Sequence, residues 1–295
     1  MSSNEPFIRE TEVIVGPLRE DQGGGPVNQA LRILSSGDRS SLRIRFSVKK
    51  THMGIPNNST IEIFNLSRAS AERIRAAQTR VRLSAGYQNT GLDVVVNGGI
   101  LSSVTEKQEA DRVTRFQVRD GYGGQLRGIT NKTFAPNANV ADIVREMSQN
   151  MPGVSTGDID VDGVIGPGGL SVSDRSADAL DQLAAQYGFN WSIQNGVFQA
   201  LQDTRAFGRV FLVSSQSRNL IKVAPILTGP MQINNGVEIQ AILNPSLVPG
   251  DQVRLESDAN PDLNGTYKIH EIDMEGDTFD KNWTMTIRSF RFPGL

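Results

Sequence analysis

The chain has 295 residues and a formal net charge of −2, which argues against a dedicated nucleic-acid-binding protein, since these usually carry a large excess of Lys and Arg. It contains no Cys, which excludes disulfides, thiolate metal sites and cysteine nucleophiles. The two histidines, His52 and His270, leave few choices for a mechanism that needs an imidazole.

Residues 1–120 consist mainly of segments that are typical of strands. The segment Leu42–Val48 alternates strictly, so its apolar side chains share one face and its two arginines lie on the other. Further strands are predicted over residues 7–15, 60–64, 81–87, 92–96, 100–105 and 113–119. We therefore expect the first block to be an antiparallel barrel or sandwich.

Two features interrupt this block. The Gly-rich segment Gly23–Pro26 breaks the strand pattern, and the purpose of residues 16–42 stays open, although a loop that reaches a neighbouring molecule would fit there. A short helix is predicted to begin at Ser67 or Ser70, because either side chain can cap the first turn, and to bury Ile74.

Residues 121–215 predict a small α+β unit. Asn139 and Ser176 are candidate caps of two helices, and Gly188 is a stop signal for the second. The apolar residues expected on the buried helix faces are Val140, Ile143, Val144, Met147, Leu180, Leu183, Ala184 and Tyr187. A hairpin follows over residues 189–201, with its turn at residues 194–196.

Residues 216–295 return to the strand pattern. Strands are predicted over residues 236–243, 253–255, 266–272 and 283–287, and Pro249-Gly250 predicts a tight turn. This block resembles the first in style, so we expect a second small barrel. The predicted fold class is mainly β with a smaller α+β part, divided at residues 1–120, 121–215 and 216–295.

Two turn-forming segments need a choice between interpretations. Asn97-Gly98 is a strong hairpin signal, because the favoured two-residue turn needs positive φ at both positions. The segment Gly121–Gly124 resembles part of a phosphate-binding loop, but the third required glycine would fall at Leu126. We interpret it as a flexible linker between domains.

Two segments resemble the start of a calcium loop, and whether either binds a metal stays open. Asp158–Gly163 reads D-x-D-x-D-G, but the twelfth position is Gly169 where a bidentate Glu is needed, so a strand with outward acids is favoured. Asn260–Gly265 has Glu271 at its twelfth position, but the intervening residues alternate like a strand. A hairpin loop with Asn264-Gly265 at its turn is favoured there.

No catalytic, cofactor-binding or metal-binding residue is predicted, and the protein is not expected to be an enzyme. His52 lies in a loop-like polar segment, and His270 lies in a predicted strand without a nucleophile motif nearby. The carboxylates Asp273, Glu275 and Asp277 could suit glycoside cleavage, but their alternation is explained more simply by an exposed strand end.

Several segments together resemble the baseplate hub (tail hub) proteins of contractile-tailed bacteriophages. Their order and spacing over nearly the whole chain carry the resemblance, more than any one of them. The segments are Asn57–Ser67, Val81–Tyr87, Gly98–Ile100, Asp120-Gly121, Leu180–Ala184, Trp191–Gly196, Leu243–Gly250, Gly265–Tyr267 and Gly276–Thr278.

The resemblance implies two tail-tube-like antiparallel β-barrel domains, a small α/β domain and no active site. It also implies a homotrimer, in which two tube-like domains from each chain form a pseudo-sixfold ring. Such a ring adapts a sixfold tail tube, or a tube-initiator protein, to a threefold central spike among other baseplate proteins. DNA would pass through its channel without specific binding, and we expect the channel wall to be neutral to acidic. The expected location is the virion tail baseplate, assembled in the bacterial cytoplasm.

Other functions stay open at this stage. The hub of a related contractile injection system, such as a tailocin or a secretion spike base, belongs to the same mechanical class. A tail-associated cell-wall hydrolase or a carbohydrate-binding module would need an acid pair, metal ligands or aromatic platforms, which the composition supplies poorly. The polar amino terminus and the lack of a long apolar run predict no secretion signal and no membrane insertion. The residues of the assembly interface are not predicted.

Overall fold

The computed structural model describes residues 8–16, 30–38, 40–76, 80–228 and 233–291, and these are mainly β, with 55% of residues in strands and 14% in helices. This confirms the predicted fold class. The Gly-rich break at Gly23–Pro26 lies outside the described residues. Within the described ranges, no helix has both the length and the hydropathy of a membrane span.

The first block forms seven strands and one short helix. In chain order they are β1 (Arg9–Gly16), β2 (Leu31–Ser35), β3 (Ile44–Thr51), β4 (Asn58–Phe64), α1 (Arg68–Ala76), β5 (Arg80–Tyr87), β6 (Gly91–Gln108) and β7 (Asp111–Asp120). The predicted helix is confirmed: the Ser67 hydroxyl accepts a hydrogen bond from the amide of Ser70 at 3.1 Å, and Ile74 is buried.

The last block, together with β13 just before it in the chain, forms six strands and one 3-10 turn. These are β13 (Val210–Ser214), β14 (Leu220–Thr228), β15 (Ile233–Ile242), β16 (Gln252–Glu256), η1 (Pro261–Leu263), β17 (Gly265–Asp277) and β18 (Trp283–Phe290). The predicted tight turn is present, because Gly250 has a φ of 95° and the amide of Asp251 donates to the carbonyl of Val248.

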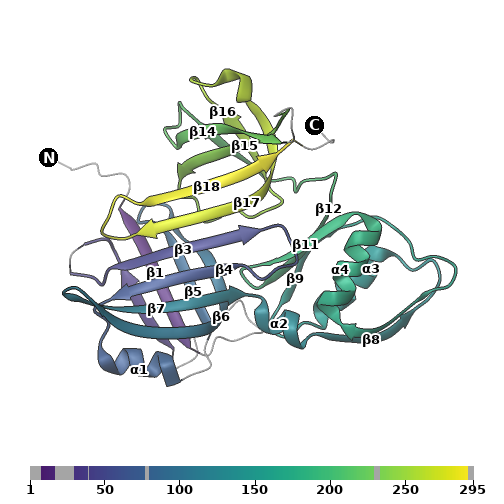
Figure 1. Cartoon of the computed structure of the whole chain (residues 1–295), viewed down its shortest axis with the longest axis horizontal. Coiled ribbons are helices and arrows are strands. Elements are labelled where there is room, and N and C mark those ends of the chain that lie inside the picture. Colours follow the sequence, from purple (N-terminus) through teal and green to yellow (C-terminus); the bar gives the residue numbers. More distant parts are fainter. Residues whose placement is uncertain (1–7, 17–29, 39, 77–79, 229–232, 292–295) are drawn as a thin grey trace.

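The two β blocks share one sheet. Its main path runs β14-β15-β18-β17-β3-β4-β7-β6-β5-β1-β2, with β13 and β16 as a branch beside β17. The joint is the antiparallel pairing of residues 45–51 of β3 with residues 271–277 of β17. Figure 1 shows the last block stacked on the first along this joint. Over the described residues, no pairing joins β14 to β2.

A single hydrophobic core continues through this joint. The alternation in β3 buries Ile44, Phe46 and Val48, as the sequence predicts, and the Phe46 ring meets Trp283 of β18 edge to face at 5.6 Å. Because strand pairing and side-chain packing both cross from one block to the other, neither block buries its apolar face alone.

The α/β unit has its own core and lies to one side of the sheet (Figure 1). Its elements are α2 (Tyr122–Arg127), β8 (Ile129–Phe134), α3 (Val140–Gln149), β9 (Ser155–Asp160), β10 (Leu170–Arg175), α4 (Ser176–Tyr187), β11 (Phe189–Gln194) and β12 (Val197–Gln202). Both helices and the hairpin are confirmed. The Asn139 side chain caps α3 through the amide of Ala141 at 2.8 Å.

The second predicted cap is wrong by one residue. Arg175 occupies the cap position of α4, and the hydroxyl of Ser176 instead shares a hydrogen bond with Thr130 at 2.8 Å. Gly188 ends the helix as predicted, with a φ of 68°. The buried hydroxyl therefore ties α4 to β8, because the side chain points into the unit rather than toward the first turn.

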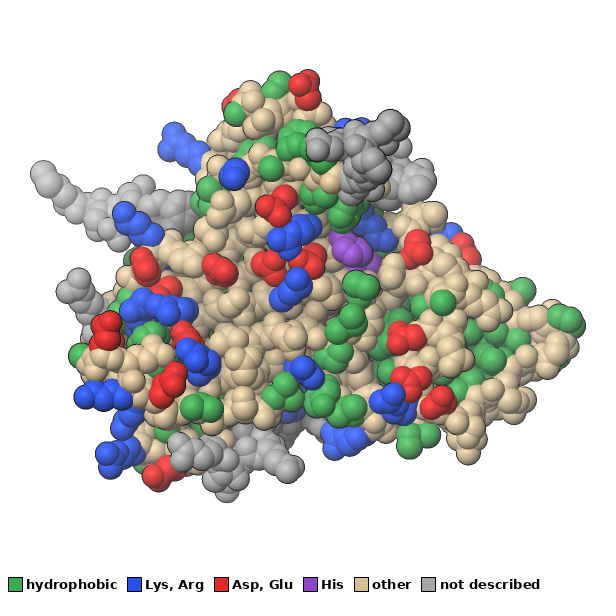
Figure 2. Space-filling view, viewed as in Figure 1, with side chains coloured by type: hydrophobic (Ala, Val, Ile, Leu, Met, Phe, Trp, Pro, Cys, Tyr) green, Lys and Arg blue, Asp and Glu red, His purple; other side chains and the backbone are tan. Residues whose placement is uncertain are grey.

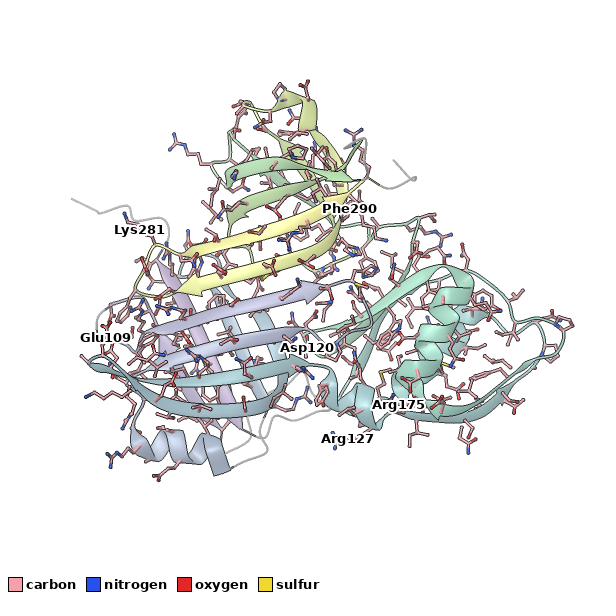
Figure 3. The ribbon with its side chains drawn as sticks, in the orientation of Figure 1. Glu109, Asp120, Arg127, Arg175, Lys281 and Phe290 are labelled. Atoms are coloured by element: carbon pink, nitrogen blue, oxygen red, sulfur yellow. The ribbon has the colours of Figure 1, made fainter. Side chains whose placement is uncertain are left out.

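One predicted turn and one predicted linker are also wrong. Asn97-Gly98 lies inside β6, and a Cβ on Gly98 would meet the carbonyl oxygen of Arg119 at 2.4 Å, so this glycine permits close strand approach. The β6–β7 turn lies instead at Glu109, which has a φ of 53° and is labelled in Figure 3. Gly121 has a φ of 65° and begins α2, so the expected linker is a short helix.

The core at the joint makes a specific prediction about stability. A Cβ added at Gly276 of β17 would lie 2.3 Å from the Phe46 ring and 3.0 Å from the Trp283 ring. We expect Gly276→Ala to lower the free energy of unfolding by about 1–3 kcal/mol, because a packed core must shift to admit a methyl group. Urea unfolding of the full chain measures this loss.

Gly99→Ala is the matched control, since Gly99 also lies in a strand and no atom comes within 4 Å of its added Cβ. Its unfolding free energy should stay within about 0.5 kcal/mol of the wild type. Equal effects of the two substitutions would contradict the packing described for the joint.

Candidate assembly surfaces

The outward face of the shared sheet carries charged side chains that are paired across strands, and we call it the ion-pair face. Its first network links Arg43 and Arg45 to Asp277, Arg45 to Glu62, and Arg115 to Glu62 and Glu106. Its second links Lys49 to Glu271, and Arg288 to Glu271, Asp273 and Glu238. Figure 2 shows acidic and basic side chains interspersed over this face.

Strand register explains these pairs. The pairing places Arg45 opposite both Glu62 of β4 and Asp277 of β17, and it places Arg115 of β7 opposite Glu62. Opposite charges that face each other across a strand pair are favourable, and like charges there are not. The two networks hold five basic and six acidic residues, so the face is close to neutral.

Asp277 departs from the expected exposed strand end. Glu275 is exposed, but Asp277 is 2% exposed, and its carboxylate accepts hydrogen bonds from Arg43 at 2.6 and 2.9 Å. Burial alone would raise the pKa of Asp277, but hydrogen bonds from Arg43, the amide of Phe279 and Arg45 outweigh this and lower it. This carboxylate is therefore structural, because two arginines hold it at the joint.

The α/β unit is held against the sheet by polar contacts to its β11–β12 turn. The Asp120 carboxylate at the end of β7 accepts hydrogen bonds from the amides of Asn195 and Gly196. The Gln194 amide group donates to the carbonyl of Thr51 at 2.8 Å. Figure 3 shows Asp120 at this boundary between sheet and unit. The contacts are side chain to backbone, so they fix the position of the turn.

Two ionisable groups are buried near this boundary. Burial raises the pKa of Asp120 to about 7, although the amides of Asn195 and Gly196 and the charge of Lys50 favour the carboxylate. Burial lowers the pKa of Lys50 to about 8, although nearby carboxylates including Asp120 favour the ammonium. Lys50 is 2% exposed, and no described residue accepts a hydrogen bond from its ammonium.

An apolar groove of about 490 Å³ lies where the two β blocks meet on another side. Its lining includes Tyr87, Phe211, Leu243, Leu247 and Met285. The Tyr87 hydroxyl donates to the carbonyl of Leu243 at 3.2 Å across the groove. The Leu243–Gly250 segment, one of those that carry the resemblance, therefore forms part of the boundary between blocks.

The structure assigns other roles to the two calcium-like segments. Ile159 and Val161 point inward and the acids outward, as the strand interpretation predicts, and Arg205 pairs with Asp160 and Asp162. The Asn260 segment is the loop between β16 and β17, and Glu271 pairs with Lys49 and Arg288. Over the described part of the chain, no group of three or more His, Asp or Glu residues is arranged to hold a metal ion.

His52 was expected in a polar loop, but it is completely buried. Its ring lies 6.5 Å from that of Phe207, because the segment after β12 covers the end of β3. His270 is half-buried and lines the same cavity as His52. The structure therefore brings the two histidines together, which the sequence does not indicate.

Comparison with known proteins identifies the family. A family model described as baseplate hub gp41 matches residues 28–289. The chain belongs to the baseplate hub gp41 family. It is thus a structural component of the phage tail baseplate. No curated protein sequence matches the chain significantly.

Solved structures show that the fold of this hub chain recurs in tails and secretion machines. The tail protein from Neisseria meningitidis MC58 has a TM-score of 0.62 at 11% identity, with 97% of each chain covered. The 43 kDa tail protein of prophage MuSo2 from Shewanella oneidensis has a TM-score of 0.61 at 9% identity, over 96% of this chain and 98% of that one.

An E. coli component of the type VI secretion system has a TM-score of 0.62 at 10% identity. The match covers 85% of the hub chain and 74% of that protein, which is described as structurally similar to the T4 tail proteins gp27 and gp5. At these identities the likeness concerns the fold alone.

Patterns in the sequence do not identify most of the residues that form the ion-pair face and the boundary between the sheet and the α/β unit. The partners of Arg45, Asp277 and Asp120 lie far away in the chain, so no local pattern connects them. One signal was present: extending the alternation of β3 by one step places Lys50 on the buried face.

The buried Lys50 predicts how stability depends on pH. Its pKa is about 8 in the folded hub against about 10.5 when unfolded, so between these values the unfolded chain holds a proton that the folded chain has lost. The free energy of unfolding contributed by Lys50 therefore rises with pH over this interval, by up to about 3 kcal/mol. Urea unfolding of wild type and Lys50→Met at both ends of the interval measures the difference.

Lys49→Met is the control, since Lys49 lies on the same strand but on the ion-pair face. We expect the rise to remain in full in Lys49→Met and to become smaller in Lys50→Met, where the part due to Lys268, whose pKa burial also lowers to about 8, is left. If Lys50→Met keeps the full rise, another group must cause it.

Proposed function

We propose that three copies of this hub form a closed ring that adapts the sixfold tail tube to the threefold central spike. The observation that carries the proposal is the β3–β17 pairing, which fixes two β blocks side by side in one chain. Three such chains present six β blocks around an axis, so one ring can offer near-sixfold contacts on one side and threefold contacts on the other.

The proposed domain division is residues 1–120, 121–215 and 216–295, with the difference that β13 (Val210–Ser214) pairs with β16 of the last block. It is supported by the separate core of the α/β unit, whose buried residues lie between Phe134 and Ala200. The α/β unit would sit beside the ring wall, and the β blocks would form the wall. In this proposal the hub carries out no reaction, and assembly takes place in the bacterial cytoplasm before the virion is complete.

We further propose that the ion-pair face lines the channel through which DNA passes. Free Lys and Arg on such a wall would accumulate phosphate contacts and slow the passage of DNA. Within the two networks the cations are already paired with carboxylates, and there is one more acid than base. The near-neutral balance supports a wall that DNA passes without binding.

A second candidate in the same mechanical class is the hub of a related contractile injection system. The fold likeness to the E. coli type VI component favours it. Electron microscopy of particles that carry the hub distinguishes the two functions, because only a phage tail is attached to a DNA-filled head.

Ring formation predicts a defined mass. We expect the hub, alone or mixed with its spike protein, to form a particle of three 32.1 kDa chains with a central opening. Light scattering gives the mass and negative-stain imaging gives the symmetry. A chain that stays monomeric with both the tube and the spike proteins present would refute the proposed ring.

The channel wall predicts a gain of DNA binding when its carboxylates are removed. The double variant Glu62→Gln, Asp273→Asn leaves Arg45, Arg115 and Arg288 with fewer partners. We expect wild type to show no binding to duplex DNA at low ionic strength and the variant to bind, with a salt slope of about −1 to −2. Fluorescence anisotropy measures both.

The matched control is Asp142→Asn with Asp178→Asn, which frees Arg145 and Arg175 on the α/β unit with the same change in net charge. This control should bind DNA less than the wall variant. Equal binding would show that net charge, rather than the position of the arginines, decides the result.

A further inference from the structure

A cavity of about 260 Å³ lies where three parts of the chain meet. The first block contributes His52, which follows β3. The α/β unit contributes Asn190 of β11 and Asp203, which follows β12. The last block contributes Lys268 and His270 of β17 and Arg291, which follows β18. Figure 2 shows an exposed histidine side chain below the last block, next to basic side chains. No motif of the sequence predicts this grouping.

The charges around the cavity favour an anion. Lys268 is 9% exposed, and among the residues that the structure describes its ammonium donates two long hydrogen bonds, to the carbonyls of Gln202 and Asp203 at 3.4 and 3.3 Å. The Arg291 guanidinium lies over the Tyr267 ring, 5.8 Å from its centre. The carboxylate in the lining, Asp203, already accepts a hydrogen bond from Asn190.

The buried ring of His52 lies behind the cavity wall without a hydrogen-bond partner among the described residues. Both ring nitrogens are buried, and no described residue forms a hydrogen bond with either of them. A neutral imidazole must carry one N–H, and leaving a buried donor unpaired is unfavourable. Burial and the charge of Lys268 lower the pKa of His52 to about 3, so the ring is neutral at pH 7 and adds no competing charge to the wall.

We propose that this cavity binds a small tetrahedral oxyanion, with inorganic phosphate as the simplest ligand, held by Lys268, Arg291 and the imidazole N–H of His270, next to the neutral ring of His52. The volume is below the roughly 300–1,000 Å³ of typical sites for organic ligands, which favours an ion of phosphate size. Because the lining comes from both β blocks and the α/β unit, the bound ion holds these three parts together.

The two histidines permit a direct test on the full chain. Histidine labelled with ¹⁵N gives two sets of imidazole signals, and both residues line the cavity. We expect millimolar phosphate to shift both sets with saturation and to raise the unfolding temperature, whereas chloride at equal ionic strength does neither. Absence of phosphate-specific shifts in the wild type would overturn the proposal, whatever the variants show.

Lys268→Gln removes the buried charge and should weaken phosphate binding about tenfold or more, since a hydrogen bond to a charged group is worth that much. Lys222→Gln is the matched control, because Lys222 is an exposed lysine on β14 of the same block. Its affinity for phosphate should equal that of the wild type. Unchanged affinity in a folded Lys268→Gln protein would overturn the proposed site.

Discussion

The antiparallel pairing of β3 with β17 is the contact on which the rest of this hub depends. It joins strands that are more than 200 residues apart in the chain, and it makes one sheet out of two blocks. The hydrophobic core follows the sheet across the joint, so Phe46 of one block packs on Trp283 of the other. A long-range strand pair of this kind has a large entropic cost of loop closure, which the continuous core offsets.

The same pairing determines the outward face. Its register sets Arg45 between Glu62 and Asp277, and it brings Lys49 to Glu271, so charges from several strands neutralise one another. Exposed ion pairs of this kind contribute little to stability individually. Their proposed value lies in function, because a wall of paired charges has few free cations to hold DNA. The α/β unit meets the sheet differently, through Asp120 and Gln194 contacts to backbone groups of one turn.

The sequence determined the local structure where one physical signal dominated. Period 2 in Leu42–Val48 and the 3.6-residue period after Asn139 gave the strand and the helix that the structure contains, and Gly188 ends its helix for the predicted reason. The mainly β class followed from the same patterns. Local signals failed where a distant partner overruled them: Asn97-Gly98 is not a turn, because Gly98 packs against the backbone of β7. The segment Gly121–Gly124 likewise forms the start of α2 instead of a linker, and a Cβ on Gly124 would lie 2.5 Å from Val154 in the same unit.

Only the tertiary structure decided the surfaces and the sites. The sequence pattern predicted an exposed Asp277. In the fold its carboxylate is buried and accepts hydrogen bonds from Arg45 of β3 and from Arg43, which precedes β3. The sequence pattern placed His52 in a polar loop, but the segment after β12 covers it in the fold. The cavity that it lines with Lys268 and His270 exists because three distant segments of the chain meet there. Periodicity reports which side of an element is buried, since that is a local property of the backbone. Periodicity does not report which other element packs on the buried side. The identity of that element depends on strand order and register, which connect residues far apart in the chain.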